Sequence, residues 1–186
     1  MVRENGKGRG GVTVIINSGP LMALAKLGLL DLLPRLYGQV SFPAAVFAEV
    51  VTGGRERGYS DAFLVQLAIR QGKLKVVEVN EGDLPAHIQN LPLDAGEKQT
   101  LYLAQQNKAD LTLFDDEKAR EEAKAIGLNV KGTLGVIAQA YRTGLLELND
   151  VETIIEAITN REDIWISEEL CRRVLKKLKT ADKEVK

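Results

Sequence analysis

The chain has 186 residues, of which 45% are apolar and 27% are charged. These are the proportions of an ordinary globular domain, and a chain of this length buries enough surface to fold without disulfides or a structural metal. A single cysteine and a single histidine exclude a disulfide framework or a multi-histidine metal site within one chain. Because 25 basic residues oppose 26 acidic ones, no global field attracts nucleic acid.

The distribution of charge and apolar residues divides the chain into three parts. Residues 1–11 are rich in glycine and basic side chains, which predicts a flexible basic tail. Residues 12–146 are expected to form one domain, and 147–186 a C-terminal helical extension packed on it. Both ends are basic and the body between them is acidic, which suits the binding of cations. No apolar run reaches the roughly 18 residues of a membrane span, so we expect no membrane partner and a cytoplasmic location.

Short apolar strands alternate with helices in the first half of the chain. In chain order, the expected elements are a strand at 12–16, helices within 21–36, a strand at 39–42, a helix at 44–51, a helix at 61–71 and a strand at 74–79. Gly28 is expected to divide the first helical region, and the run Thr52-Gly53-Gly54 to end the next helix, with a surface loop after it. Asp61 is expected to cap the helix that follows this loop.

The same alternation continues in the second half. The expected elements are a helix at 94–106, a strand at 109–114, a helix at 117–126, a short strand at 128–130, a helix at 133–143 and two final helices capped near Asp150 and Ser167. Strands that alternate with helices in this way are typical of a parallel sheet covered on both faces. The sequence therefore predicts an α/β fold, a three-layer α/β/α sandwich around a short, mainly parallel sheet.

Polar residues follow the strands at the edge where such sheets bind ligands. Asn17 and Ser18 follow the first strand, and the pair Asp115-Asp116 follows the fourth. Glu49 and Glu97 lie in helices from which they can reach the same edge. Carboxylates that converge repel one another unless a cation neutralises them, and oxygen ligands suit Mg²⁺ or Mn²⁺. Such ions support the hydrolysis of phosphodiesters.

Five sequence blocks match a known family in order and over residues 12–146. They are Asn17–Gly28 against DxSPLIxLxKxG, Pro43–Glu49 against PxxVxxE, Leu93–Ala104 against LDxGExxxxxLA, Asp115–Arg120 against DDxxAR, and Gly132–Gly144 against GTLGxxxxAxxxG. With these blocks the chain resembles PIN-domain ribonucleases, including the VapC-type toxins of toxin–antitoxin pairs. Each block alone is a weak signal, whereas the five in sequence are a strong one.

The resemblance implies a PIN-like fold and a metal-dependent endoribonuclease, a hydrolase that acts on RNA. It implies that Mg²⁺ or Mn²⁺ is held by Asn17, Glu49, Glu97, Asp115 and Asp116, with the four acidic residues catalytic and Asp116 preferred to Asp115 as the ligand. Ser18 and Thr133 would support the site by orienting ligands or a phosphate. An antitoxin protein and a homodimer are the partners that the resemblance suggests.

Asn17 departs from the family pattern, which has aspartate at this position. An amide oxygen can ligate Mg²⁺, but it carries no charge and accepts no proton, so metal binding and water activation should both weaken. The competing hypothesis is therefore a catalytically inactive PIN scaffold that serves as an RNA- or protein-binding regulatory module. A receiver-like domain, with Lys131 after the fifth strand, is a third interpretation.

Local structural roles compete with the functional ones at several of these residues. Asp94 and Glu97 have the spacing of a capping box, Asp115-Asp116 can cap the next helix, and Glu49 alone is typical of a solvated helix face. Trp165 is expected to pack against a C-terminal helix or a dimer partner. The basic run on the last helix is either a solvated face or an RNA contact, through Arg172, Arg173, Lys176 and Lys177.

Overall fold

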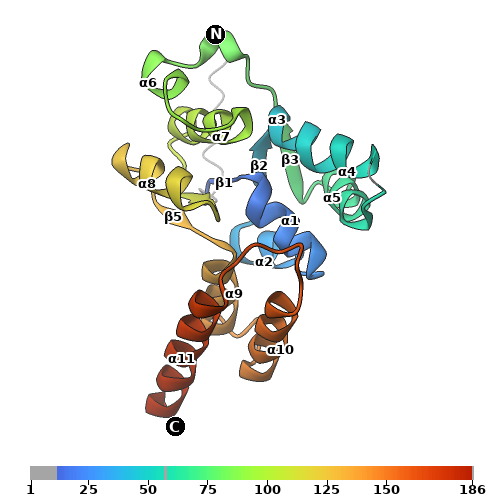
Figure 1. Ribbon diagram of the computed structural model, residues 1–186, viewed down its shortest axis with the longest axis vertical. Coiled ribbons are helices and arrows are strands. Elements are labelled where there is room, and N and C mark those ends of the chain that lie inside the picture. Colours follow the sequence, from blue (N-terminus) through green and yellow to red (C-terminus); the bar gives the residue numbers. More distant parts are fainter. Residues whose placement is uncertain (1–11, 57, 186) are drawn as a thin grey trace, which may run out of the picture.

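The computed structural model describes residues 12–56 and 58–185, and the side chains among them up to residue 181. The basic tail predicted at 1–11 lies outside the described residues. Figure 1 shows a central sheet whose strands are β1 (Val14–Ile16), β2 (Val40–Pro43), β3 (Leu74–Val77), β4 (Leu111–Leu113) and β5 (Val130–Lys131). The strand order is β3-β2-β1-β4-β5, and every neighbouring pair is parallel. The predicted parallel sheet is confirmed.

The helices fill the intervals between the strands. They are α1 (Ser18–Lys26), α2 (Leu32–Tyr37), α3 (Ala44–Phe47), α4 (Gly53–Glu56), α5 (Ser60–Arg70), α6 (Ala86–Gln89), α7 (Ala95–Gln106), α8 (Glu117–Ala125), α9 (Thr133–Arg142), α10 (Leu148–Thr159) and α11 (Glu168–Val185). A π-helical turn, η1 (Ala48–Thr52), joins α3 to α4, and a 3₁₀ turn, η2 (Glu81–Asp83), precedes α6. Within the described residues, none of these helices has the length and apolar character that crossing a membrane requires.

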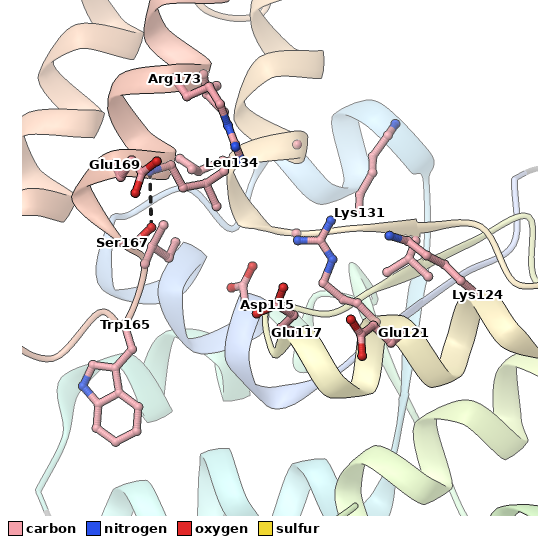
Figure 2. Close-up of a pocket in the computed structure, with 17 residues that line it drawn as sticks. Asp115, Glu117, Glu121, Lys124, Lys131, Leu134, Trp165, Ser167, Glu169 and Arg173 are labelled. Carbon is pink, nitrogen blue, oxygen red and sulfur yellow. Dashed lines mark hydrogen bonds between the residues drawn. The ribbon is translucent and has the colours of Figure 1, made fainter.

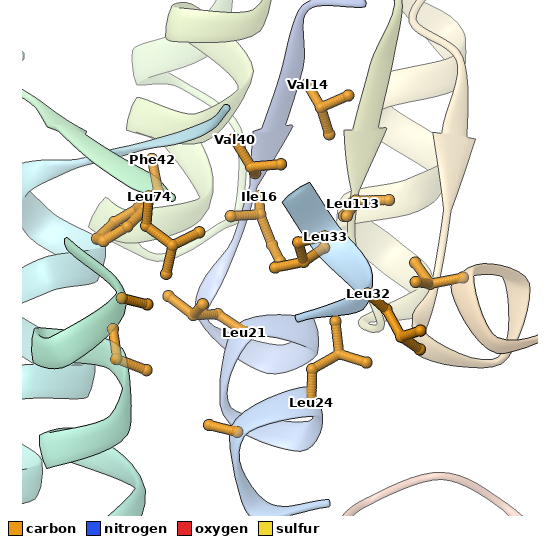
Figure 3. Close-up of a cluster of buried hydrophobic side chains, with 14 of the residues drawn as sticks. Val14, Ile16, Leu21, Leu24, Leu32, Leu33, Val40, Phe42, Leu74 and Leu113 are labelled. Atoms are coloured by element: carbon orange, nitrogen blue, oxygen red, sulfur yellow. The ribbon is translucent and has the colours of Figure 1, made fainter. Parts of the chain in front are cut away.

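Side chains alternate between the two faces of the sheet and so bury two separate cores. On one face, Val14, Ile16 and Leu113 pack against leucines of α1 and α2, as Figure 3 shows, and against α5 and α9. On the other face, Ile15 packs against α7, and Phe114 packs against α6, α7 and α8. Helices therefore cover both faces, and the three-layer α/β/α architecture is confirmed.

The strand order reverses direction between β1 and β4. The chain builds outward from β1 through β2 to β3, and then returns to place β4 on the other side of β1, where Ile16 pairs with Leu113. At such a switch point the connections that leave the two strands diverge and open a crevice at their carboxyl ends. Asn17 and Asp115 follow these two strands, so both lie at the edge of that crevice.

The expected helix end at Thr52-Gly53-Gly54 is wrong. The chain stays helical from α3 through η1 and α4, because Gly53 has ordinary helical angles and Gly54 is needed for packing. A Cβ on Gly54 would lie 2.9 Å from the Cβ of Ala62 in α5, so only glycine allows the two helices to approach this closely. Asp61 is not the cap either: α5 starts at Ser60 with Tyr59 at the N-cap position, and Asp61 is buried in its first turn.

The last two helices form a further apolar cluster with α9 and α1. Val151, Ile155 and Ile158 of α10 and Cys171 and Leu178 of α11 are buried in it. Figure 1 shows α9, α10 and α11 side by side below the sheet. The division of the chain at residue 146 stays a prediction, although this cluster shows that α10 and α11 pack on helices of the preceding segment.

Candidate active site

Asp115 is held at the N-terminus of α9. Its Oδ1 accepts a hydrogen bond from the backbone N–H of Thr133 at 2.7 Å, and its Oδ2 accepts one from the Thr133 hydroxyl at 2.5 Å. A Cβ on Gly132 would lie 2.6 Å from Asp115 Oδ1, so the backbone can approach the carboxylate only without a side chain there. Both oxygens of Asp115 are thus committed to fixing β4 against the start of α9.

Burial raises the pKa of Asp115 above its usual value of 3.8. The two hydrogen bonds from Thr133 and the nearby Arg120 guanidinium act in the opposite direction, since they favour the charged form. Burial outweighs these contacts, so the pKa of Asp115 stays above its usual value, while the hydrogen bonds hold the carboxylate in one orientation.

Asp116 is the N-cap of α8. Its Oδ1 accepts a hydrogen bond from the backbone N–H of Ala119 at 2.8 Å, and its side chain is exposed. The capping role considered from the sequence is therefore confirmed for Asp116. The hydrogen bond of the cap uses Oδ1 and does not use Oδ2. A cap uses one carboxylate oxygen, so it does not preclude a second contact.

Glu97 combines a capping box with a cluster of like charges. Its Oε2 accepts a hydrogen bond from the backbone N–H of Asp94, while its own N–H donates to Asp94 Oδ1. Burial raises the pKa of Glu97 above its usual 4.5, the hydrogen bond from the Asp94 backbone lowers it, and the carboxylates of Asp94, Asp116 and Glu49 raise it further. Carboxylates from α7, α8 and η1 therefore act on one another across the edge of the sheet.

Glu49 belongs to the π-helical turn η1. Its Oε2 lies 3.6 Å from the position of a Cβ on Gly96, which places the carboxylate beside the first turn of α7. The wider π turn changes which side chains of the segment face inward, and such turns are frequent at functional sites. The sequence predicts Glu49 on an ordinary helix, whereas the structure places it on a π-helical turn, close to Glu97.

Asn17 lies between β1 and α7 and is 5% exposed. The hydroxyl of Thr100 lies 3.1 Å from its side-chain oxygen and 2.7 Å from the carbonyl oxygen of Gly96. Since a hydroxyl has one hydrogen, it donates to only one of these two acceptors at a time. Ser18, the first residue of α1, is buried beside Asn17.

The side-chain oxygens at this edge of the sheet are of the kind that binds a hard cation. They are carboxylate and amide oxygens, and the mutual repulsion that raises the pKa of Glu97 is what a bound cation would relieve. In the described part of the chain, no three acidic, histidine or cysteine side chains already form a group able to hold a metal ion. The oxygens are thus of the kind that Mg²⁺ and Mn²⁺ prefer, but they are not gathered into a closed set of ligands.

Two cavities meet at Asp115. One, with a volume of about 740 Å³, lies between α8, β5 and α11, and Figure 2 shows Asp115 near its centre with Arg173, Lys124 and Lys131 around it. The other, of about 690 Å³, contains Asp115 and Asp116 and extends toward the start of α5. Asp115 thus lines both cavities, whereas Asp116 lines only the second.

The basic run on α11 divides into one residue near the site and three that do not line these cavities. Arg173 lines the first cavity, whereas Arg172 is paired with Glu168 at 3.2 Å on the exposed side of α11. Lys176 and Lys177 are exposed further along the helix. An RNA contact through this run stays a prediction, and the structure favours Arg173 for it.

Three residues near the site are missed by the sequence analysis. Thr100 lies one turn after Glu97 on α7, a spacing that places the two on one side of the helix. Arg120 ends the DDxxAR block and acts on Asp115, although the sequence analysis gives it no role. Trp165, expected to pack against a C-terminal helix or a dimer partner, does not pack on a helix: it is 93% exposed and lines both cavities, and packing on a dimer partner stays a prediction.

A parallel α/β domain with acidic residues at its switch point agrees with the comparisons with known proteins. A family model, DUF3368, described as a PIN domain, matches residues 13–180. The chain therefore belongs to the PIN-domain family, whose members are generally nucleases. No curated protein matches the chain.

A solved structure with a TM-score above 0.5 supports the same fold. A PilT N-terminus domain protein from the hyperthermophilic archaeon Sulfolobus solfataricus P2 superposes with a TM-score of 0.51 at 16% identity, covering 69% of this chain and 93% of its own. A domain of a functionally unknown protein from Methanocaldococcus jannaschii DSM 2661 has a TM-score of 0.43 at 17% identity, covering 65% of this chain and 90% of its own. At this identity, the first likeness concerns the fold alone.

Removing the charge of Glu97 should stabilise the protein at neutral pH. Glu97→Gln keeps an oxygen that can accept from the Asp94 amide but removes the repulsion, so we expect Tm to rise by roughly 1–2 °C at pH 7. Because folding raises the pKa of Glu97, its ionisation destabilises the fold as the pH rises above 4.5, and the gain should vanish below that pH. Thermal unfolding across this range measures it.

The control for this measurement is Glu156→Gln on the exposed side of α10, for which we expect no comparable pH-dependent gain. A lower Tm for Glu97→Gln than for the parent at pH 7 would show that the capping contact outweighs the repulsion.

Proposed function

We propose that the chain is a divalent-metal-dependent endoribonuclease of the PIN type, acting on RNA with Mg²⁺ or Mn²⁺. The observation that carries the proposal is the proximity of Glu49 and Asp116 to Glu97: the Glu49 carboxylate lies beside Gly96 at the start of α7, and both carboxylates raise the pKa of Glu97. Membership of the PIN-domain family supports it.

In this proposal, Glu49, Glu97, Asp116 and the side-chain oxygen of Asn17 hold the ion. When bound, the ion would activate water and stabilise the charge that develops on the phosphate. Glu97 and Asp116 each give one oxygen to a backbone amide, which fixes the direction of the carboxylate. Asp115 acts as a positioning residue, since each of its oxygens accepts a hydrogen bond from Thr133 and so holds the start of α9 against the end of β4. Ser18 supports the adjoining backbone.

The family resemblance extends this proposal to biological context. It suggests a toxin of a toxin–antitoxin pair in the cytoplasm, with an antitoxin protein as partner and a homodimer as the assembly. Binding of RNA through Arg173, with Arg172, Lys176 and Lys177 beyond it on α11, belongs to the same proposal.

A specific observation favours one alternative, an inactive PIN scaffold that binds RNA or protein. Asn17 replaces the aspartate of the family pattern, and the acidic side chains described here do not form a closed ligand group. This alternative predicts binding of RNA with no measurable Mn²⁺ affinity and no cleavage.

The test is cleavage of single-stranded RNA by the full chain with Mn²⁺, with and without EDTA, together with calorimetry of Mn²⁺ binding. We expect Mn²⁺-dependent cleavage that EDTA abolishes and that Glu49→Gln lowers by about tenfold or more. Glu56→Gln, at an exposed position on the same helical segment, should cleave like the parent. A chain that neither cleaves RNA nor binds Mn²⁺ rules the proposal out.

A further inference from the structure

Trp165 has an exposure that its role in the fold does not explain. It lies in the connection between α10 and α11, and it is the most exposed large apolar side chain among the described residues. Its neighbours Ile164 and Ile166 both pack into the apolar cluster formed by the C-terminal helices. The backbone is therefore anchored on both sides while the indole ring stays outside.

The ring is also fixed in orientation. The indole Nε1 donates a hydrogen bond to the backbone oxygen of Glu162 at 3.1 Å, which restricts rotation of the side chain. A fixed, solvent-exposed indole contributes little to folding. It offers a ligand a flat apolar face, and little side-chain entropy is lost on binding because the ring is already ordered.

The position of Trp165 connects it to the acidic site. It lines both cavities that meet at Asp115, and Figure 2 shows the ring projecting away from the end that holds Lys124 and Lys131. Tyr59, half exposed just before α5, lines the second cavity together with Trp165. Two aromatic side chains from different elements thus border the cavity that contains Asp115 and Asp116.

We propose that Trp165 stacks against an unpaired base of the RNA strand whose phosphate is cleaved at the acidic site, with Tyr59 as a second stacking residue. This inference rests on the proposed function and names single-stranded RNA as the form of the substrate. Base–aromatic stacking tolerates any base and is a common way to bind single strands. The adjoining phosphates would pass along the first cavity, where Arg120 and Arg173 lie.

The charges on the two sides of the ring suit a nucleic-acid strand, because basic side chains that can bind phosphates, Arg120, Lys124 and Arg173, line the first cavity. In the second cavity six of the fourteen lining residues are acidic, among them Asp61, Glu117 and Glu162, and its one lysine, Lys26, is paired with Asp163 at 3.3 Å. An uncharged base needs only the face of the ring.

Intrinsic fluorescence tests the inference directly, because Trp165 is the only tryptophan of the chain. The full chain is titrated with a single-stranded oligouridylate, with Ca²⁺ in place of Mg²⁺ and a gel to verify that the RNA stays intact. We expect quenching by this strand, and much weaker quenching by an abasic oligomer of the same length or by duplex RNA. Binding of labelled RNA without any quenching would overturn the proposal.

Anisotropy with the labelled strand measures the variants. Trp165→Ala should weaken binding by about tenfold, and Trp165→Phe should recover part of the loss. Phe63→Ala, at another exposed aromatic residue that lies outside both cavities, should bind like the parent. Unchanged affinity of Trp165→Ala contradicts the inference, as does a change in its sedimentation coefficient that reveals a protein interface.

The outcome is separable from that of the nuclease assay. Mn²⁺-dependent cleavage with unchanged binding by Trp165→Ala would remove the stacking role and leave the nuclease. Quenching by single-stranded RNA without any cleavage would support the stacking role and remove the nuclease.

Discussion

Asn17→Asp should raise the affinity of the chain for Mn²⁺ by roughly tenfold to a hundredfold, with RNA cleavage rising in parallel. The change adds a negative charge at a buried position between β1 and α7, beside the elements that carry Glu97 and Asp115. The site can accept the carboxylate without rearrangement, because the Thr100 hydroxyl can donate to it instead of to Gly96. Calorimetry and single-turnover cleavage measure the two effects.

The same substitution should destabilise the metal-free protein. An additional charge that is almost fully buried beside other carboxylates costs about 1–3 kcal/mol of unfolding free energy, and saturating Mn²⁺ should restore it. The control is Asn17→Ala, which removes the amide without adding charge and should gain no affinity. If Asn17→Asp binds Mn²⁺ no better than the parent, residue 17 is not a ligand.

Removing Asp115 should cause the largest loss of stability at the site. Asp115→Ala leaves the amide and hydroxyl of Thr133 without their acceptor and Arg120 without its neighbouring carboxylate. We expect the free energy of unfolding to fall by about 2–4 kcal/mol, and Tm by roughly 5–15 °C. Chemical and thermal unfolding at neutral pH measure this loss.

Two threonine substitutions separate the contribution of the hydrogen bond between Thr133 and Asp115 from the general cost of replacing a threonine. Thr133→Val keeps the backbone contact but removes the hydroxyl donor, and should cost about 1–2 kcal/mol. Thr153→Val removes a hydroxyl that bonds only within α10, and should stay within about 0.5 kcal/mol of the parent. Equal losses in the two variants would mean that Asp115 does not depend on Thr133.

The sequence predicts the arrangement of the sheet well, because alternating strands and helices leave few arrangements that bury both faces. It also predicts that Asn17 and Asp115 share an edge, since residues that follow parallel strands emerge on one side. The capping roles of Asp94, Glu97 and Asp116 are equally local and are confirmed.

Other features depend on contacts that no local pattern contains. Gly53 and Gly54 suggest the end of a helix, but close packing of α4 on Ala62 of α5 keeps the chain helical. The π turn that carries Glu49 is not visible in a run of helix-compatible residues. From the sequence, a large aromatic residue such as Trp165 is expected to be packed. Its ring lies outside because its neighbours Ile164 and Ile166 both pack into the C-terminal apolar cluster.

The pairing of β1 with β4 also determines when the acidic site can exist during synthesis of the chain. Thr13 and Asp110, which are hydrogen-bonded at this junction, are 97 residues apart in sequence. The partner that fixes Asp115 comes later still, at Thr133. Contacts this distant form late because a long loop must close first. A nascent chain that ends before α9 therefore contains every acidic residue of the site but lacks the Thr133 donors that fix Asp115. The activity proposed above should accordingly arise only after α9 has been synthesised.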